Sequence, residues 1–79
     1  MNRDDILNGI TEIVKDILEK DDINLTEDST AKDIEGWDSL AHISILEAVQ
    51  SEYSVEFDLE EIIDMASVGD IITAVVNKR

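Results

Sequence analysis

Residues 38–53 read DSLAHISILEAVQSEY, and this stretch decides the fold. Asp38 is a good helix N-cap because its carboxylate can accept the unpaired backbone N–H groups of a first turn. The spacing then predicts a helix over residues 39–53. A helix in a small bundle needs one apolar face for the core. The apolar residues here occupy more than one face, so we expect some of them to contact a partner: Leu40, Ile43, Ile45, Leu46, Val49 and Tyr53.

The segment before this helix predicts a first helix and a long loop. Apolar residues recur with helical spacing over residues 3–20, which favours an amphipathic helix; they are Ile6, Leu7, Ile10, Ile13, Val14, Ile17 and Leu18. Residues 21–37 are mostly polar, with Ile23, Leu25 and Ile34 as isolated anchors. A loop of this length in a small domain often contains a helical turn, which we expect at residues 29–32.

The segment after this helix predicts two more helices. Asp58 and Glu61 form a reciprocal capping pair that opens a short helix, with one buried side made by Leu59, Ile62 and Ile63. Ser67, with Asp70 three residues later, opens the last helix by the same signature. The apolar stripe of this last helix is Val68, Ile71, Ile72, Val75 and Val76.

The expected fold is all-α: a small four-helix bundle of three longer helices and a short third helix, with a long loop between the first two. A chain of 79 residues forms one domain, residues 1–79. It has no Pro, three Gly and 4% aromatic residues, which suits helices better than a β-sandwich. A pocket for a modest substrate needs roughly 300 Å³. Four short helices can hardly enclose that volume, so we expect a carrier or binding module and no enzyme.

The charge is strongly negative and unevenly distributed. The chain has 20 acidic against six basic residues. The bases are Arg3, Lys15, Lys20, Lys32, Lys78 and Arg79, so residues 33–77 contain none. Such a surface repels nucleic-acid phosphate and anionic membranes and attracts basic proteins. The chain lacks Cys and a signal peptide, and has no apolar run of about 20 residues. We therefore expect a soluble, monomeric protein of the cytoplasm that neither binds nucleic acid nor inserts into membranes.

The acidic second and third helices predict a docking surface for basic partners. Electrostatics of this kind contributes more to encounter rate and partner choice than to affinity. The alternative is a solvated acidic face that confers solubility. We expect the docking residues to be Ile43, Glu47, Glu52, Glu60 and Glu61.

A serine at a loop–helix corner is the most informative local feature. It lies in Gly36-Trp37-Asp38-Ser39-Leu40-Ala41-His42-Ile43, next to a flexible glycine and exposed to an incoming enzyme. The unpaired N–H groups of a first turn suit an anion. This motif, within the expected helical framework, resembles the attachment motif of acyl carrier proteins. In that family the Ser of Asp-Ser-Leu carries 4′-phosphopantetheine.

The resemblance implies a carrier that performs no catalysis. A phosphopantetheinyl transferase would attach the arm of coenzyme A to Ser39, with Asp38 contacting that enzyme or its metal ion and Leu40 beside the site. The arm would bear acyl intermediates as thioesters for acyl-transferring, ligase or synthase enzymes with basic docking surfaces, in fatty-acid, polyketide or related biosynthesis. An acyl chain is expected to enter a gap between the second and third helices, lined by Ile45, Leu46, Ile62 and Ile63.

Other interpretations of these residues remain open at this point. The chain could be an acidic interaction module without a prosthetic group, or a peptidyl carrier, although Trp37-Asp38 replaces the Gly-His pair frequent before the serine of peptidyl carriers. Ser39 and His42 could form a nucleophilic pair, but this would need an orienting group and an oxyanion hole. We expect His42 to be solvated or partner-facing and Trp37 to pack the loop onto the bundle. No EF-hand motif is present, so no metal site is expected.

Overall fold

The computed structural model describes residues 2–78, which form helices and connecting segments without a strand. The elements are α1 (Arg3–Leu18), a 3₁₀ helix η1 (Ala31–Asp33), α2 (Ser39–Tyr53), α3 (Leu59–Asp64) and α4 (Val68–Lys78). This arrangement confirms the predicted all-α class and the long connection between the first two major helices. Arg79, counted above among the bases, lies outside the described residues.

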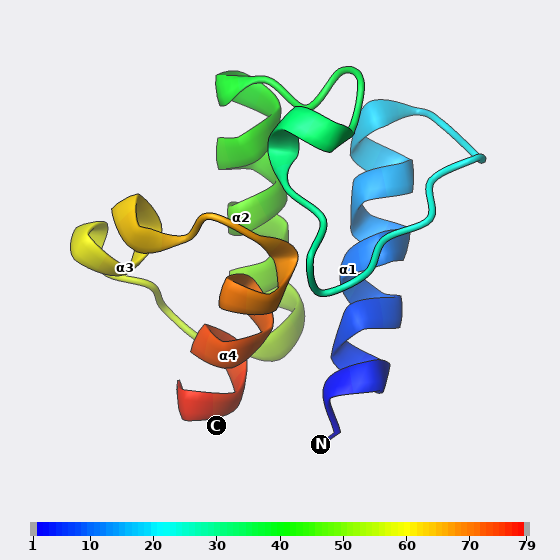
Figure 1. The fold of residues 1–79 in the computed structure, drawn as a ribbon. Coiled ribbons are helices and arrows are strands. Elements are labelled where there is room, and N and C mark those ends of the chain that lie inside the picture. Colours follow the sequence, from blue (N-terminus) through cyan, green and yellow to red (C-terminus); the bar gives the residue numbers. More distant parts are fainter. Residues whose placement is uncertain (1, 79) are drawn as a thin grey trace.

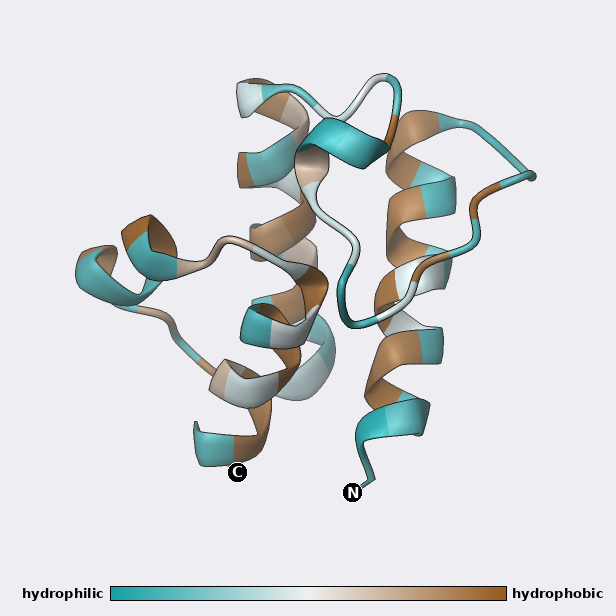
Figure 2. Ribbon diagram, viewed as in Figure 1, coloured by the Kyte–Doolittle hydropathy of each residue, from teal (hydrophilic) through white to brown (hydrophobic). Residues whose placement is uncertain are grey.

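Helix α1 packs against α2 and α4, while α3 lies on the side of the molecule away from α1 (Figure 1). The helices enclose one hydrophobic core, and Figure 2 shows the hydrophobic band of α1 turned toward α2. Three residues of the α1 stripe, Ile6, Ile10 and Val14, are completely buried. The core also contains Ile23, Leu25, Trp37, Ile45, Leu46, Val49, Tyr53, Val55, Phe57, Val68, Ile71, Ile72, Ala74 and Val75.

Helix α1 ends two residues before the position that its apolar pattern predicts. Glu19 adopts the left-handed conformation, with φ 54° and ψ 46°. The backbone N–H of Glu19 donates to the Asp16 carbonyl, and that of Lys20 donates to the Lys15 carbonyl at 3.0 Å. These bonds close the helix as a Schellman motif does. The expected range of 3–20 is therefore corrected to Arg3–Leu18, because a non-glycine residue forms the C-cap.

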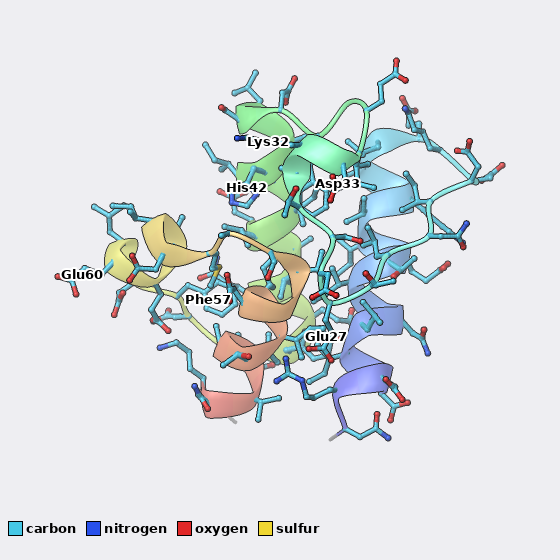
Figure 3. The ribbon with its side chains drawn as sticks, viewed as in Figure 1. Glu27, Lys32, Asp33, His42, Phe57 and Glu60 are labelled. Carbon is cyan, nitrogen blue, oxygen red and sulfur yellow. The ribbon has the colours of Figure 1, made fainter. Side chains whose placement is uncertain are left out.

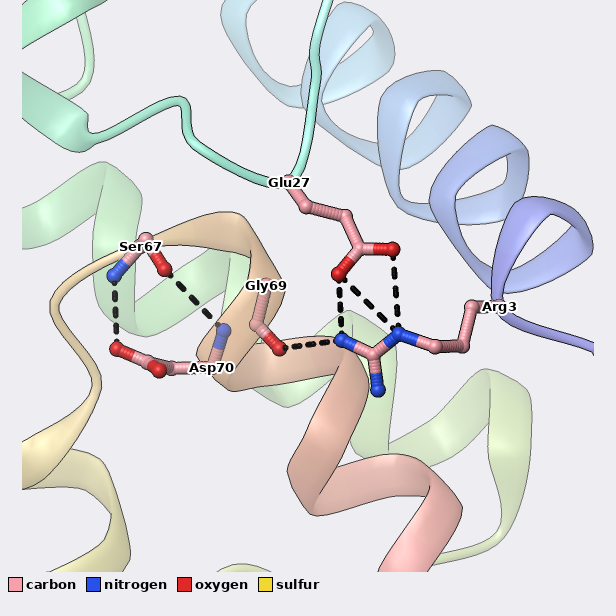
Figure 4. A network of polar contacts seen from close by, with 5 residues as sticks. All are labelled: Arg3, Glu27, Ser67, Gly69 and Asp70. Atoms are coloured by element: carbon pink, nitrogen blue, oxygen red, sulfur yellow. Dashed lines mark hydrogen bonds and ion pairs between the residues drawn. The ribbon is translucent and has the colours of Figure 1, made fainter.

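Hydrogen bonds hold the long loop between α1 and α2 against α4 and against the start of α1. Its backbone lies beside the start of α4, where the N–H of Gly69 donates to the Glu27 carbonyl at 2.8 Å and that of Val68 to the Ser29 carbonyl at 2.9 Å. Figure 4 shows the second fastening: the Arg3 Nε lies 3.1 Å from both Glu27 carboxylate oxygens, and its Nη2 lies 3.2 Å from the Gly69 carbonyl. The loop's helical turn falls at residues 31–33 and not at the expected 29–32.

Helix α3 is attached to the rest of the molecule by few side chains. Its predicted capping box is present: the Asp58 N–H donates to Glu61 at 3.0 Å, and the Glu61 N–H donates to Asp58 at 2.9 Å. However, the expectation of a buried side is wrong for two of its three residues. Leu59 and Ile63 are 72% and 71% exposed, and only Ile62 packs partly against the core. A helix of six residues is too short to present a complete apolar stripe to the core.

Candidate attachment site at the start of α2

Ser39 is the first residue of α2, and the segment before it turns sharply to place it there. Gly36 has φ 93°, a left-handed conformation that a residue with a side chain rarely adopts. The N–H of Trp37 donates to the Ile34 carbonyl at 3.2 Å, and that of Asp38 donates to the Gly36 carbonyl at 3.1 Å. The chain therefore enters α2 from a tight turn, and the Ser39 side chain is exposed.

Asp38 caps α2 as the sequence predicts. Its Oδ1 accepts the Ala41 N–H at 2.8 Å, while its carbonyl accepts the His42 N–H at 2.8 Å. Substitution of such a cap by Ala typically destabilises a protein by about 0.5–2 kcal/mol. Since Asp38 supplies the cap, the hydroxyl of Ser39 is not required for this role. The hydroxyl is available for other chemistry at an exposed helix start.

The side chain of His42 accepts a hydrogen bond from Trp37, a contact that sequence reasoning missed. The Trp37 Nε1–H donates to His42 Nδ1 at 3.0 Å, with the ring centroids 6.0 Å apart. Trp37 is 7% exposed, in keeping with the expected packing of the loop onto the bundle. His42 is half-buried, so it is less solvated than expected, and the alternative expectation of a partner-facing side chain stays a prediction. Among residues 2–78 no hydrogen bond joins Ser39 to His42, so the nucleophilic-pair interpretation gains no geometric support.

The Trp37–His42 bond is expected to break on acidification. Burial lowers the pKa of His42, and Nδ1 can accept the indole N–H only while it is unprotonated. Neutral His42 contributes fully to the stability of the fold above pH 6.5, which is about the ordinary pKa of histidine in an unfolded chain. This contribution is lost as the pH falls from about 6.5 to the lower pKa that His42 has in the folded protein. We expect the Trp37 Nε1–H signal in ¹⁵N–¹H spectra to titrate with a midpoint below 6.5, and this transition to vanish in His42→Leu. A midpoint above 6.5 would contradict the assignment.

A cavity of about 480 Å³ opens beside Ser39. Its wall combines residues of α2, the long loop, the α3–α4 connection and α4: Ser29, Ala31, Trp37, Asp38, Ser39, His42, Ile43, Met65, Ala66, Ser67, Val68 and Ile71. This cavity is partly open to solvent, and the expectation that four short helices can hardly enclose a pocket of roughly 300 Å³ stays a prediction. Sequence reasoning missed the contribution of the α3–α4 connection, because these residues meet Ser39 only in the folded chain.

None of the four residues expected to contact an acyl chain lines this cavity. Ile45 and Leu46 are 0% and 2% exposed and belong to the core. Ile62 is partly buried, and Ile63 points into solvent. These four side chains therefore belong to the core or the surface and not to this cavity, and the acyl-chain gap between the second and third helices stays a prediction. The reason is helical phase: residues 39, 42 and 43 of α2 face the cavity, whereas residues 45, 46 and 49 face the core.

The expected docking residues differ in their exposure and in whether they already have a partner within the protein. Ile43 is 55% exposed, and Leu40, which was expected beside the attachment site, is 77% exposed. Glu47, Glu52 and Glu60 are also exposed, and Figure 3 shows Glu60 pointing outward from α3. The Glu61 carboxylate, in contrast, lies 2.8 Å from the Lys78 Nζ, and this hydrogen bond lowers the pKa of Glu61. Glu61 therefore already ties α3 to α4 and also caps α3.

No helix within residues 2–78 has the length and apolarity required to cross a membrane. Within the same residues, no group of three or more His, Asp or Glu side chains is arranged to hold a metal ion.

Comparisons with known proteins converge on one family. The family model described as "Phosphopantetheine attachment site" matches residues 8–75, which include Ser39. An acyl carrier protein from Thermotoga maritima is 27% identical over 77 residues, covering 98% of this chain and 95% of that protein. The solution structure of a holo acyl carrier protein from Geobacter metallireducens superposes with a TM-score of 0.85 at 33% identity, covering 92% of this chain and 84% of that one. The chain belongs to the acyl carrier protein family, whose members are carriers of a phosphopantetheine group and not enzymes.

Proposed function

We propose that Ser39 is the attachment residue, and that the chain carries acyl groups there and delivers them to biosynthetic enzymes of fatty-acid, polyketide or related routes. The position of Ser39 carries this proposal: it is exposed, it begins α2, and it lies within the family match. When bound, 4′-phosphopantetheine supplies a terminal thiol that holds an acyl group as a thioester. The chain itself contains no Cys and offers no thiol.

The residues around Ser39 fit a phosphopantetheine group. A phosphodiester on the Ser39 oxygen would lie at the N-terminus of α2, where the macrodipole stabilises an anion by about 0.3–1 kcal/mol. Asp38, whose carboxylate already accepts the Ala41 N–H, would contact the transferase or its metal ion. Leu40 is 77% exposed and offers apolar contact to an enzyme that approaches Ser39.

Transfer of the arm tests this proposal directly. The Ser39 Oγ would form an O–P bond and lose its proton, while the diphosphate bond of coenzyme A breaks and releases adenosine 3′,5′-bisphosphate. The purified protein is incubated with coenzyme A and a broad-specificity phosphopantetheinyl transferase and is then weighed by mass spectrometry. We expect one arm per chain. No mass gain, under conditions where a known carrier is modified, would favour an interaction module without a prosthetic group.

The acidic surface of α2 and α3 is proposed to guide basic partner enzymes to Ser39. Glu47, Glu52 and Glu60 are exposed on α2 and α3, and the apolar side chains of Leu40 and Ile43 are exposed at the start of α2. No base occurs in residues 33–77. Lys78 follows this stretch, but its ammonium group is paired with Glu61. The surface of α2 and α3 therefore presents both negative charge and exposed apolar side chains, which suits a positively charged partner.

Reversal of one charge on this surface should slow the encounter with a basic partner. We expect Glu47→Lys to lower the association rate with the transferase by about 10-fold at low salt, because charge steering changes on-rates by factors of 10–10³. Asp16→Lys on the exposed face of α1 makes the same charge change on a helix outside the proposed docking surface and serves as the control. Stopped-flow association rates at low and high salt measure both effects. Equal slowing by both variants, or slowing that salt does not reduce, would argue against steering.

The protein is also proposed to act as a monomer in the cytoplasm. The proposal is supported by the high net charge of −14, which disfavours self-association, and by the absence of Cys residues that an oxidising compartment would pair. Sedimentation equilibrium at physiological salt is expected to give a mass of 8.8 kDa, plus that of the arm in the modified protein.

A further inference from the structure

One of the residues that line the cavity beside Ser39, His42, has a ring nitrogen without a hydrogen bond to the described part of the protein. Most polar groups of the wall are used: the Ser29 Oγ accepts the Thr26 N–H at 3.0 Å, and the Ser67 Oγ accepts the Asp70 N–H at 3.3 Å. Asp38 caps α2. The imidazole ring of His42 makes one hydrogen bond within residues 2–78, at Nδ1, so its other ring nitrogen has no protein partner there.

Trp37 determines which nitrogen of His42 carries the proton. An indole N–H can only donate, and Trp37 is buried, so its N–H needs an acceptor. His42 Nδ1 provides it at 3.0 Å. In the neutral ring the proton must then reside on Nε2, because the hydrogen bond at one nitrogen sets the state of the other. The buried tryptophan thus turns His42 into an oriented N–H donor in the wall of the cavity.

We propose that His42 is a positioning and specificity-determining residue for the cargo: its Nε2–H donates a hydrogen bond to a hydroxyl or carbonyl oxygen on the acyl group that enters the cavity from Ser39. The proposal rests on the attachment at Ser39 proposed above. A plain alkyl group of the same length would cover the donor, exclude water and leave it unpaired. Because an unpaired buried donor is costly, such a site discriminates against cargo that lacks the acceptor.

The test compares two cargoes that differ by one oxygen. Ser39 is loaded from butyryl- or 3-hydroxybutyryl-coenzyme A by the transferase, and the cleavage of each thioester by hydroxylamine is followed by mass. Each rate is divided by the rate for the same acyl-coenzyme A, which removes the intrinsic difference in reactivity. We expect the hydroxylated cargo to be protected roughly 2- to 10-fold more than butyryl, the range that one net hydrogen bond supports.

Three variants assign this preference to the Trp37–His42 pair. His42→Leu keeps an apolar side chain of moderate size without the donor, and should bring the protection ratio to one. Trp37→Phe keeps an aromatic ring without the orienting N–H, and should reduce the ratio. Ser44→Ala changes an exposed residue of α2 that does not line the cavity, and should leave the ratio unchanged.

A measurement on the unaltered protein gives a test that does not depend on whether the variants fold. The His42 Nε2 chemical shift should move when 3-hydroxybutyryl is loaded and should stay near its holo value with butyryl. An unchanged shift with both cargoes, or a protection ratio that persists in folded His42→Leu, would overturn the role of His42. If no cargo loads at all, the attachment proposal fails instead, so the two failures are distinguishable.

Discussion

Ser39→Ala is expected to take up no phosphopantetheine, a complete loss of loading. The substitution removes the only oxygen that the proposal assigns to the new O–P bond. Stability should change by no more than about 0.5 kcal/mol, because the Ser39 side chain is exposed and Asp38 caps the helix. Mass spectrometry after incubation with coenzyme A and the transferase measures loading, and thermal unfolding confirms the fold.

Ser44→Ala provides the matched control for this loss. Ser44 is exposed on the same helix, five residues further along, and is outside the first turn. It should load like the unaltered protein. Uptake of an arm by Ser39→Ala, or loss of uptake in Ser44→Ala, would mean that the acceptor has been assigned to the wrong residue.

Ile45→Ala is expected to lower the free energy of unfolding by about 2–5 kcal/mol, as for other large buried apolar side chains. Ile45 is completely buried and belongs to the core between the helices. A small domain has little stability in reserve, since natural proteins are stable by only about 5–15 kcal/mol. Urea unfolding followed by circular dichroism should show a much lower midpoint or an unfolded chain.

Ile43→Ala makes the same chemical change two residues away on the other side of α2. Ile43 is 55% exposed, so its replacement should alter stability by no more than about 1 kcal/mol. Ile43→Ala should instead lower the affinity for partner enzymes. Equal destabilisation by the two variants would contradict the division of α2 into a core face and an outward face.

Local signals predicted much of the fold. The range of α2 agrees with the prediction at both ends, and the capping pairs at Asp58–Glu61 and Ser67–Asp70 are present as hydrogen bonds. Such caps depend on residues three positions apart, which is information that the sequence carries directly. The all-α class followed from the same periodicity. The exposed position of Ser39 also agrees with its place at a loop–helix corner.

Contacts that form only in the folded chain account for what sequence reasoning did not predict. The Trp37–His42 bond depends on how a tight turn at Gly36 aims two rings. The cavity needs the α3–α4 connection to lie beside the start of α2. At Gly69, an added Cβ would come within 2.9 Å of the Glu27 carbonyl, a close approach that only the folded chain defines. Hydrophobic spacing also cannot say which of two apolar faces of α2 is buried.

The measurement that tests the account most directly is fragment-ion mass spectrometry of the protein after transfer from coenzyme A. Fragmentation separates Ser39 from the other serines of the chain, which are Ser29, Ser44, Ser51, Ser54 and Ser67. We predict that the whole added mass is located on Ser39. Added mass on any other residue, or an unmodified chain beside a control carrier that is fully modified, would contradict the central claim.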